Sequence, residues 1–222
     1  MRQFEALLPA GWAQVDLTTP VADTVDGIVS VMLDGYPTDV AGSLRGHLVQ
    51  RLRSAMTGLA GGGAIAAYLP VRDGLGAPVR PFIVVRPVSF EMDGEHVAPI
   101  NYLMALMAQE GTSLVDPPGM VGVKTVSDSD TAGRLSAGLA DVPADIMARV
   151  DRGGLDGAVA AGRQTRHVHY VIGVPAQDDC WMAVDASVSA PGGSDAKEVL
   201  DAVEEFVDAW VTTITWKEAS DA

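Results

Sequence analysis

Cysteine, aromatic residues and long apolar runs are all scarce in this chain. One cysteine among 222 residues rules out a disulfide within the chain and agrees with a reducing compartment. Aromatic residues make up only 5% of the sequence, so aliphatic side chains must supply most of the core. Residues 1–17 contain no apolar run long enough for a signal segment or a membrane span. Together these absences lead us to expect a cytoplasmic protein.

Positive charge is scarce as well. The chain has 15 Lys and Arg against 29 Asp and Glu, a formal net charge of −14 at pH 7. Such a surface repels phosphate backbones and anionic lipids unless basic residues cluster locally. The nearest approach to a cluster is Arg45, Arg51 and Arg53 around His47, which we interpret as a solvated helix face. We therefore expect no nucleic-acid partner and no membrane partner.

What remains is the composition of a globular protein. Hydrophobic residues make up 48% of the chain and charged residues 20%, far from the polar composition of disordered chains. The length suffices to bury a core without disulfides or metals. We expect one domain over residues 1–222, with a glycine-rich surface excursion at residues 127–164.

Periodicity predicts both helices and strands. Apolar residues recur at helical spacing in residues 21–34, 38–60, 99–109 and 195–214. Strand-like runs occupy residues 12–17, 64–71, 81–90, 112–115 and 119–126. Three glycines, Gly61 to Gly63, follow a helix and precede a strand, which indicates a helix end. A phosphate-binding loop needs the opposite order.

A β-hairpin is the clearest local pattern. Residues 167–174 and 180–188 alternate in polarity and flank a turn-rich connection at residues 175–179. Symmetric pairing about this connection places His169 opposite Asp185 and His167 opposite Ser187. With the helices at the start, middle and end, this predicts an α+β fold, an antiparallel sheet of about five to seven strands covered by helices.

The candidate site lies on this hairpin. His167, His169 and Asp185 share one face of the predicted sheet, because alternate residues of a strand project to the same side. Two imidazoles and a carboxylate form a possible metal ligand set, but the spacing alone is common, and His47 and His96 belong to no zinc motif. We interpret the three residues as a partly exposed polar surface site, with no metal and no cofactor expected.

Other reactive residue types have ordinary structural explanations. Cys180 falls on the apolar face of the hairpin, where it acts as a small core residue. No G-x-S-x-G nucleophile motif occurs. The pairs Asp128/Asp130 and Asp178/Asp179 lie in predicted loops as solvated charges. In the last predicted helix, the acidic residues Asp201, Glu204, Glu205 and Asp208 occupy the side away from the apolar stripe.

These observations favour a non-enzymatic accessory or protein-binding module whose partner is another protein. No nucleophile, base, phosphate cradle or metal motif is apparent in the sequence. The alternative is a hydrolase or transferase whose polar residues converge only in the folded state, around His167, His169 and Asp185. An enzyme predicts a concave pocket holding these side chains, and a binding module predicts a shallow exposed apolar patch.

Several short segments, in their order along the chain, resemble actinobacterial proteins of the Mog1/PsbP-like family. The segments are Leu8-Pro9-Ala10-Gly11-Trp12, Ala67-Tyr68-Leu69-Pro70-Val71, Pro117-Pro118-Gly119, His169-Tyr170-Val171-Ile172-Gly173-Val174-Pro175 and Thr213-Ile214-Thr215-Trp216. The resemblance implies an antiparallel sheet between helix layers and a binding or accessory role, without a catalytic residue set. Residues 127–164 depart from the compact pattern of that family.

Overall fold

The predicted hairpin forms the two longest strands of the fold. In the computed structural model, which describes residues 3–72, 81–92, 94–130, 163–175, 177, 180–191 and 195–217, β9 (Arg163–Gly173) pairs with β10 (Trp181–Pro191). His169 lies opposite Asp185 and His167 opposite Ser187, so the predicted register is confirmed. The amide of Val174 donates a hydrogen bond to the carbonyl of Cys180 at 2.8 Å, which closes the hairpin at its turn.

Seven strands form one antiparallel sheet around this hairpin. They run in the order β2-β3-β4-β10-β9-β8-β7, and every pairing is antiparallel. The remaining five are β2 (Trp12–Asp16), β3 (Ala66–Pro70), β4 (Phe82–Pro87), β7 (Thr112–Val115) and β8 (Gly122–Asp130). The antiparallel α+β fold predicted from the sequence is therefore confirmed.

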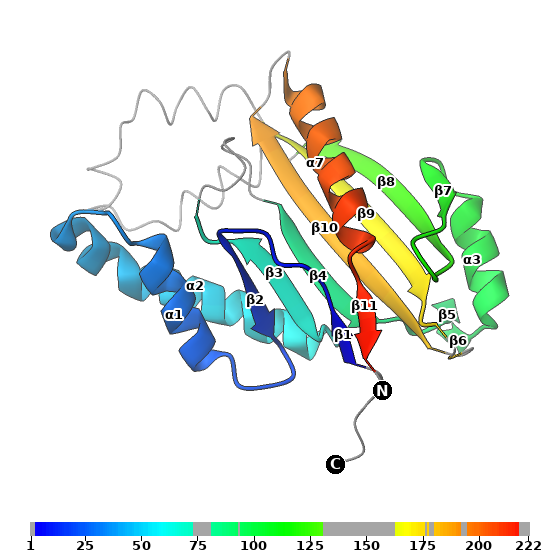
Figure 1. The fold of residues 1–222 in the computed structure, drawn as a ribbon, viewed down its shortest axis with the longest axis horizontal. Coiled ribbons are helices and arrows are strands. Elements are labelled where there is room, and N and C mark those ends of the chain that lie inside the picture. The colour runs from blue at the N-terminus through cyan, green and yellow to red at the C-terminus, as the bar shows by residue number, and fades with distance from the viewer. Residues whose placement is uncertain are drawn as a thin grey trace.

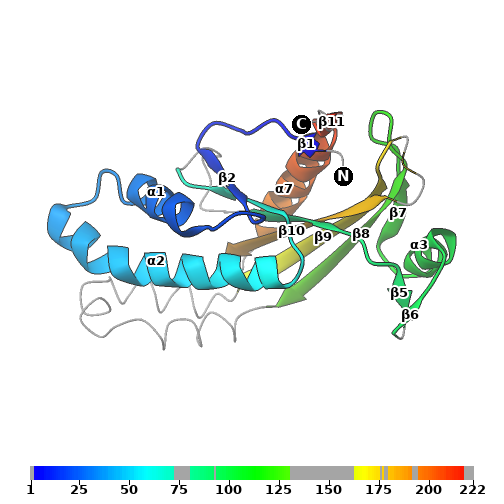
Figure 2. The same ribbon diagram turned by 90° about the horizontal axis from the view of Figure 1, so that it is seen from below.

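Helices cover both faces of the sheet (Figures 1 and 2). We call the face under α7 (Ala196–Val211) the α7 face; it carries Tyr170 and Val184, which belong with α7 to the larger core. The opposite face, the α2 face, meets α1 (Ala22–Met32) and α2 (Thr38–Gly61) in a second core over β2, β3 and β4. Among the described residues no helix combines the length and apolar character that a membrane span requires.

The other elements lie at the two ends of the chain and at the β7 edge. β1 (Gln3–Glu5) pairs with β11 (Thr215–Lys217) in a two-stranded sheet. β5 (Glu91–Met92) and β6 (Glu95–His96) form a short hairpin, followed by α3 (Pro99–Met107). Both views place this hairpin and α3 beside β7 and β8 (Figures 1 and 2).

Both ends of the excursion expected at residues 127–164 are strand instead. Residues 127–130 belong to β8 and residues 163–164 to β9, and Asp128 pairs with Arg166 across the two strands. Ser and Asp alternate here because one faces each side of the sheet, a pattern that the sequence interpretation took for a polar loop. Residues 131–162 lie outside the described residues, as do Asp178 and Asp179.

Cys180 and Trp181, which follow the hairpin turn, lie on opposite faces of the sheet, as the alternation along the strand implies. Neither side chain is fully buried. Cys180 is only partly buried, at the margin of the larger core, so its predicted burial is incomplete. Trp181 lies on the α2 face, where its ring contacts Gly173 and meets Phe90 edge-on at 6.0 Å. Phe90 in turn meets Tyr102 of α3 at 5.4 Å, so this chain of rings connects α3 to the sheet.

Two buried polar atoms of the larger core have no hydrogen-bond partner in the described part of the chain. Among the described residues neither the hydroxyl of Tyr68 nor Nε1 of Trp12 makes a hydrogen bond, and both are buried. Burial raises the pKa of Tyr68 to about 12, so its phenol is neutral. A buried hydroxyl without a partner costs stability relative to an apolar group of the same shape.

We expect Tyr68→Phe to raise the free energy of unfolding by about 1 kcal/mol. The substitution removes only the unpaired hydroxyl and keeps the edge-on contact with Trp210 at 4.9 Å. Urea unfolding of both proteins measures the change. The opposite sign, a loss of stability, would mean that the hydroxyl is hydrogen-bonded in solution, for example by a buried water molecule.

Candidate functional site

The sequence-predicted residues lie on an open polar strip of the α2 face. The β-sheet register aligns Thr125, His169 and Asp185 across β8, β9 and β10. The next row along the strands aligns Ser127, His167 and Ser187. None of these six side chains is fully buried. The strip therefore offers hydroxyl, imidazole and carboxylate groups on the α2 face.

His169 and Asp185 are joined directly. Nδ1 of His169 lies 2.6 Å from Oδ1 of Asp185, and Nε of Arg86 donates to Oδ2 of the same carboxylate at 2.9 Å. Burial raises the pKa of Asp185, but the hydrogen bond and charge of His169, together with Arg86, outweigh it and leave the pKa below its ordinary value. The carboxylate is thus held ionised between two donors.

His167 takes no part in this pair. It lies one row further along β9, and its Nε2 is 3.5 Å from Oγ of Ser129, a long contact. Within the described part of the chain, no three His, Cys, Asp or Glu side chains are grouped as metal ligands would be. A carboxylate that orients an imidazole is one half of a general-base arrangement, but catalysis also needs a nucleophile or a substrate pocket beside the ring.

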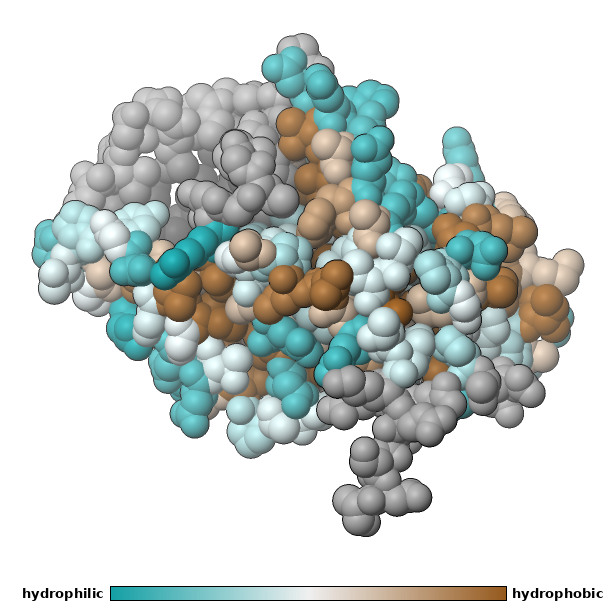
Figure 3. Space-filling view, viewed as in Figure 1, coloured by the Kyte–Doolittle hydropathy of each residue, from teal (hydrophilic) through white to brown (hydrophobic). Residues whose placement is uncertain are grey.

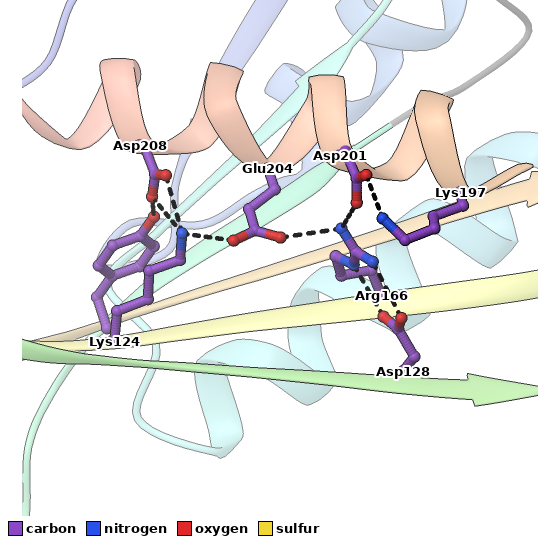
Figure 4. Close-up of polar contacts among 8 residues, drawn as sticks. Lys124, Asp128, Arg166, Lys197, Asp201, Glu204 and Asp208 are labelled. Carbon is purple, nitrogen blue, oxygen red and sulfur yellow. Dashed lines mark hydrogen bonds and ion pairs between the residues drawn. The ribbon is translucent and has the colours of Figure 1, made fainter. Parts of the chain in front are cut away.

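A larger polar cluster, which the sequence interpretation missed, lies under α7 (Figure 4). Lys124 of β8 and Arg166 of β9 are buried on the α7 face, 8% and 6% exposed. Glu204 of α7 bridges them, 2.7 Å from Nζ of Lys124 and 2.9 Å from the Arg166 guanidinium. We call this group, with the residues in contact with it, the α7 ion network.

The α7 ion network continues at both ends of Glu204. Arg166 forms a fork with Asp128 at 2.8 and 3.0 Å and also donates to Asp201 at 2.6 Å. Lys124 lies 2.8 Å from the carboxylate of Asp208, which also accepts the hydroxyl of Tyr170. Lys197 donates to Asp201 at the exposed end.

The titration shifts in the α7 ion network follow from these contacts. Hydrogen bonding to Arg166 lowers the pKa of Asp128, and hydrogen bonding to Asp128 raises the pKa of Arg166. Burial, and then the contact with Asp208, raise the pKa of Tyr170. Because the buried cations are paired with carboxylates, we assign the network a structural role, the docking of α7 on the sheet.

This network corrects the expectation for the last helix. Asp201, Glu204 and Asp208 were predicted to face away from the apolar stripe, but they contact the sheet, and only Glu205 of that set is exposed. Their spacing of three and four residues places them on one helix side. The placement of Lys124 and Arg166 within strands was a second feature that could have indicated the network. The sequence does not reveal which helix covers those strands.

An exposed apolar surface lies at the opposite edge of the sheet from β2. Although α3 is largely apolar, none of its residues is buried. Ile100 and Met104 are 61% and 66% exposed, and Leu114 of β7 is 71% exposed. We define the α3–β7 surface by its five most exposed apolar residues, Ile100, Met104, Met107, Leu114 and Val121. Figure 3 shows apolar side chains gathered over this end of the molecule.

The α3–β7 surface has an acidic margin. Residues 97–109 include no charged side chain, whereas Glu110 and Asp116 flank β7, and Glu91 and Glu95 lie on the neighbouring β5–β6 hairpin. All four carboxylates are exposed, and none forms an ion pair with another described residue. The two cations nearest in sequence are paired elsewhere, Arg86 with Asp185 and Lys124 in the α7 ion network.

The connection between α3 and β7 is tight. Gly111 has φ +75°, and a Cβ atom at this position would clash with the carbonyl oxygen of Val126. The connection from α3 to β7 therefore lies directly against Val126 of β8, and glycine is required at this point.

Two surfaces are therefore candidates for a functional site, the polar strip around His169 and Asp185 and the α3–β7 surface. Comparison of the chain with protein families, with curated proteins and with solved structures finds no match.

Proposed function

We propose that the protein is a cytoplasmic, non-enzymatic accessory protein that binds another protein through the α3–β7 surface. The observation that carries the proposal is that α3, an apolar helix, buries none of its residues. Burying one side chain of this size removes roughly 100 Å² from water, so the five residues present about 500 Å². Exposed apolar patches of this extent on soluble proteins are often interaction sites.

The composition of the surface also supports protein binding. Met104 and Met107 have flexible, polarisable side chains that adapt to different partner surfaces. An apolar centre with a charged margin is the usual anatomy of a protein interface. The resemblance to Mog1/PsbP-like proteins, whose members act as binding or accessory proteins, agrees with this function.

We expect the double substitution Ile100→Lys/Met104→Lys to abolish partner binding without changing the unfolding transition. Both side chains are mostly exposed, so lysine is tolerated in the free protein but would be desolvated in an interface. A photo-crosslinking residue placed at Met107 in the native host identifies the partner. Binding of that purified partner to the unmodified and substituted proteins then measures the loss.

The matched control is Leu7→Lys, at a side chain that is equally exposed and apolar but lies in the N-terminal segment. It should leave binding unchanged. Equal loss with both variants, or no crosslink at Met107, would contradict the proposed surface.

The second candidate function is a hydrolase or transferase centred on His167, His169 and Asp185. The 2.6 Å contact between His169 and Asp185 is the observation that favours it. Native mass spectrometry separates the two functions: a small molecule retained by the protein and lost from His169→Ala would favour the enzyme and contradict the accessory role.

A further inference from the structure

Strand β7 ends the sheet, and its outer backbone groups have no partner among the described residues. The amide of Val126 donates to the carbonyl of Gly111 at 2.9 Å, so the odd-numbered residues of this strand bond to β8. The N–H and C=O groups of Thr112 and Leu114 therefore point outward. The close contact of the Thr112 and Thr125 hydroxyls at 3.1 Å agrees with this, since non-hydrogen-bonded pairs bring side chains nearest. Among the described residues nothing bonds to these outward groups.

The side chains beside this edge lie on one side of the sheet. Leu114 pairs with Val123, which pairs with Val171, so Leu114 lies on the α2 face. Through Tyr102, Phe90 and Trp181, α3 is attached to the same face. An added strand would therefore meet β7 with its backbone and the exposed apolar residues of α3 with alternate side chains.

We infer that β7 binds an extended segment of another protein as an additional strand, and that this segment has alternating apolar residues with basic residues at its ends. This inference rests on the proposed function and names the kind of partner. Backbone pairing at Thr112 and Leu114 supplies the register, and the α3–β7 surface takes the apolar side chains. Glu110 and Asp116, one at each end of β7, select positive charge at both ends of the segment.

The same charges disfavour a second copy of this chain. Antiparallel self-pairing about Ser113 sets Glu110 directly opposite Asp116 of the second copy, and pairing about Leu114 leaves the same two residues diagonal neighbours. Like charges at these positions are destabilising, and each copy carries a net charge of −14. A basic segment removes this repulsion.

A displayed library of random dodecapeptides, selected on the intact protein, tests the inference. We expect enriched peptides to alternate apolar and polar residues and to carry Lys or Arg at both ends. For a synthetic enriched peptide, Leu114→Pro should weaken binding about tenfold or more, because proline removes an outward donor while the bonds to β8 remain. Glu110→Gln/Asp116→Asn should weaken binding about threefold or more at low salt and flatten its salt dependence.

The matched control is Gln14→Pro on β2, the other edge strand. The amide of Leu17 donates to the carbonyl of Ile65, so the odd-numbered residues of β2 bond to β3. The backbone N–H and C=O of Gln14 therefore point away from the sheet, as those of Leu114 do at the β7 edge. This variant should bind the peptide normally. Circular dichroism checks that both proline variants keep the fold.

Several outcomes would overturn the inference: enriched peptides without alternation or basic ends, equal effects of the two proline variants, or a concentration-dependent dimer formed through β7. The partner found by crosslinking distinguishes the two proposals. If Ile100→Lys/Met104→Lys abolishes its binding and Leu114→Pro does not, strand addition is wrong and the proposed function stands. If neither changes its binding, both are wrong.

Discussion

Replacing Arg166 with methionine is expected to lower the free energy of unfolding by about 3 kcal/mol. Methionine fills much of the same volume, but Glu204 loses one of its two buried cations, and Asp128 and Asp201 each lose a donor. Breaking a buried ion network by removing one member is costly because the remaining charges stay partly desolvated. Denaturant unfolding at neutral pH measures the loss.

The control for this prediction is Lys197→Met. Lys197 contacts the same Asp201 but is largely exposed, so its ion pair is screened and its removal should change stability by less than about 0.5 kcal/mol. If Arg166→Met costs no more than Lys197→Met, the α7 ion network does not hold α7 on the sheet.

The pH dependence of the same variant provides a second readout. Arg166 lowers the pKa of Asp128 in the folded state below its ordinary value of 3.8. A lowered folded pKa contributes stability above the unfolded pKa, and this contribution is lost as pH falls through the folded pKa. The stability difference between the protein and Arg166→Met should therefore narrow as the pH falls below about 4.

Trp210→Ala is expected to destabilise the protein by about 4 kcal/mol. Trp210 is a buried residue of α7; it meets Tyr68 edge-on and donates from Nε1 to the carbonyl of Leu7 at 3.1 Å. Alanine leaves a cavity in the larger core and also frees the N-terminal segment. Thermal or denaturant unfolding measures the effect.

Trp210→Phe separates packing from hydrogen bonding. It keeps an aromatic ring in the core but removes the donor to Leu7 and part of the indole volume, so its cost should be about 1–2 kcal/mol. An equal loss for both substitutions would show that the link to Leu7, and not the core, determines the stability at this position.

The hairpin could be predicted from the sequence because its information is local. Two alternating runs on either side of a short turn define which residues face each other, and the pairing of His169 with Asp185 followed from that symmetry. The predicted end of the strand at residue 126 was wrong, because β8 continues through Ser127 to Asp130, where the alternating residues are all polar. Burial of Arg166, the ion-pair partner of Asp128, depends on α7, which is distant in the sequence.

The α3–β7 surface and the α7 ion network could be predicted only in part. Helical spacing predicted α3 correctly, but a helix periodicity with a shared apolar face also predicts burial, and no residue of α3 is fully buried; Tyr102, Leu103 and Leu106 are only partly covered. The α7 ion network combines residues of β8, β9 and α7, so predicting it requires knowing that these three elements are neighbours. Such contacts depend on which elements become neighbours, and local patterns do not determine this.

The pairing of β1 with β11 determines how the fold would respond to force. Gln3 lies directly opposite Lys217. Tension that pulls these two residues apart therefore breaks the hydrogen bonds between β1 and β11 one after another. A pair loaded in this way yields before strands that must be sheared all at once. The short β1–β11 pair would therefore open first under load and protect the seven-stranded sheet.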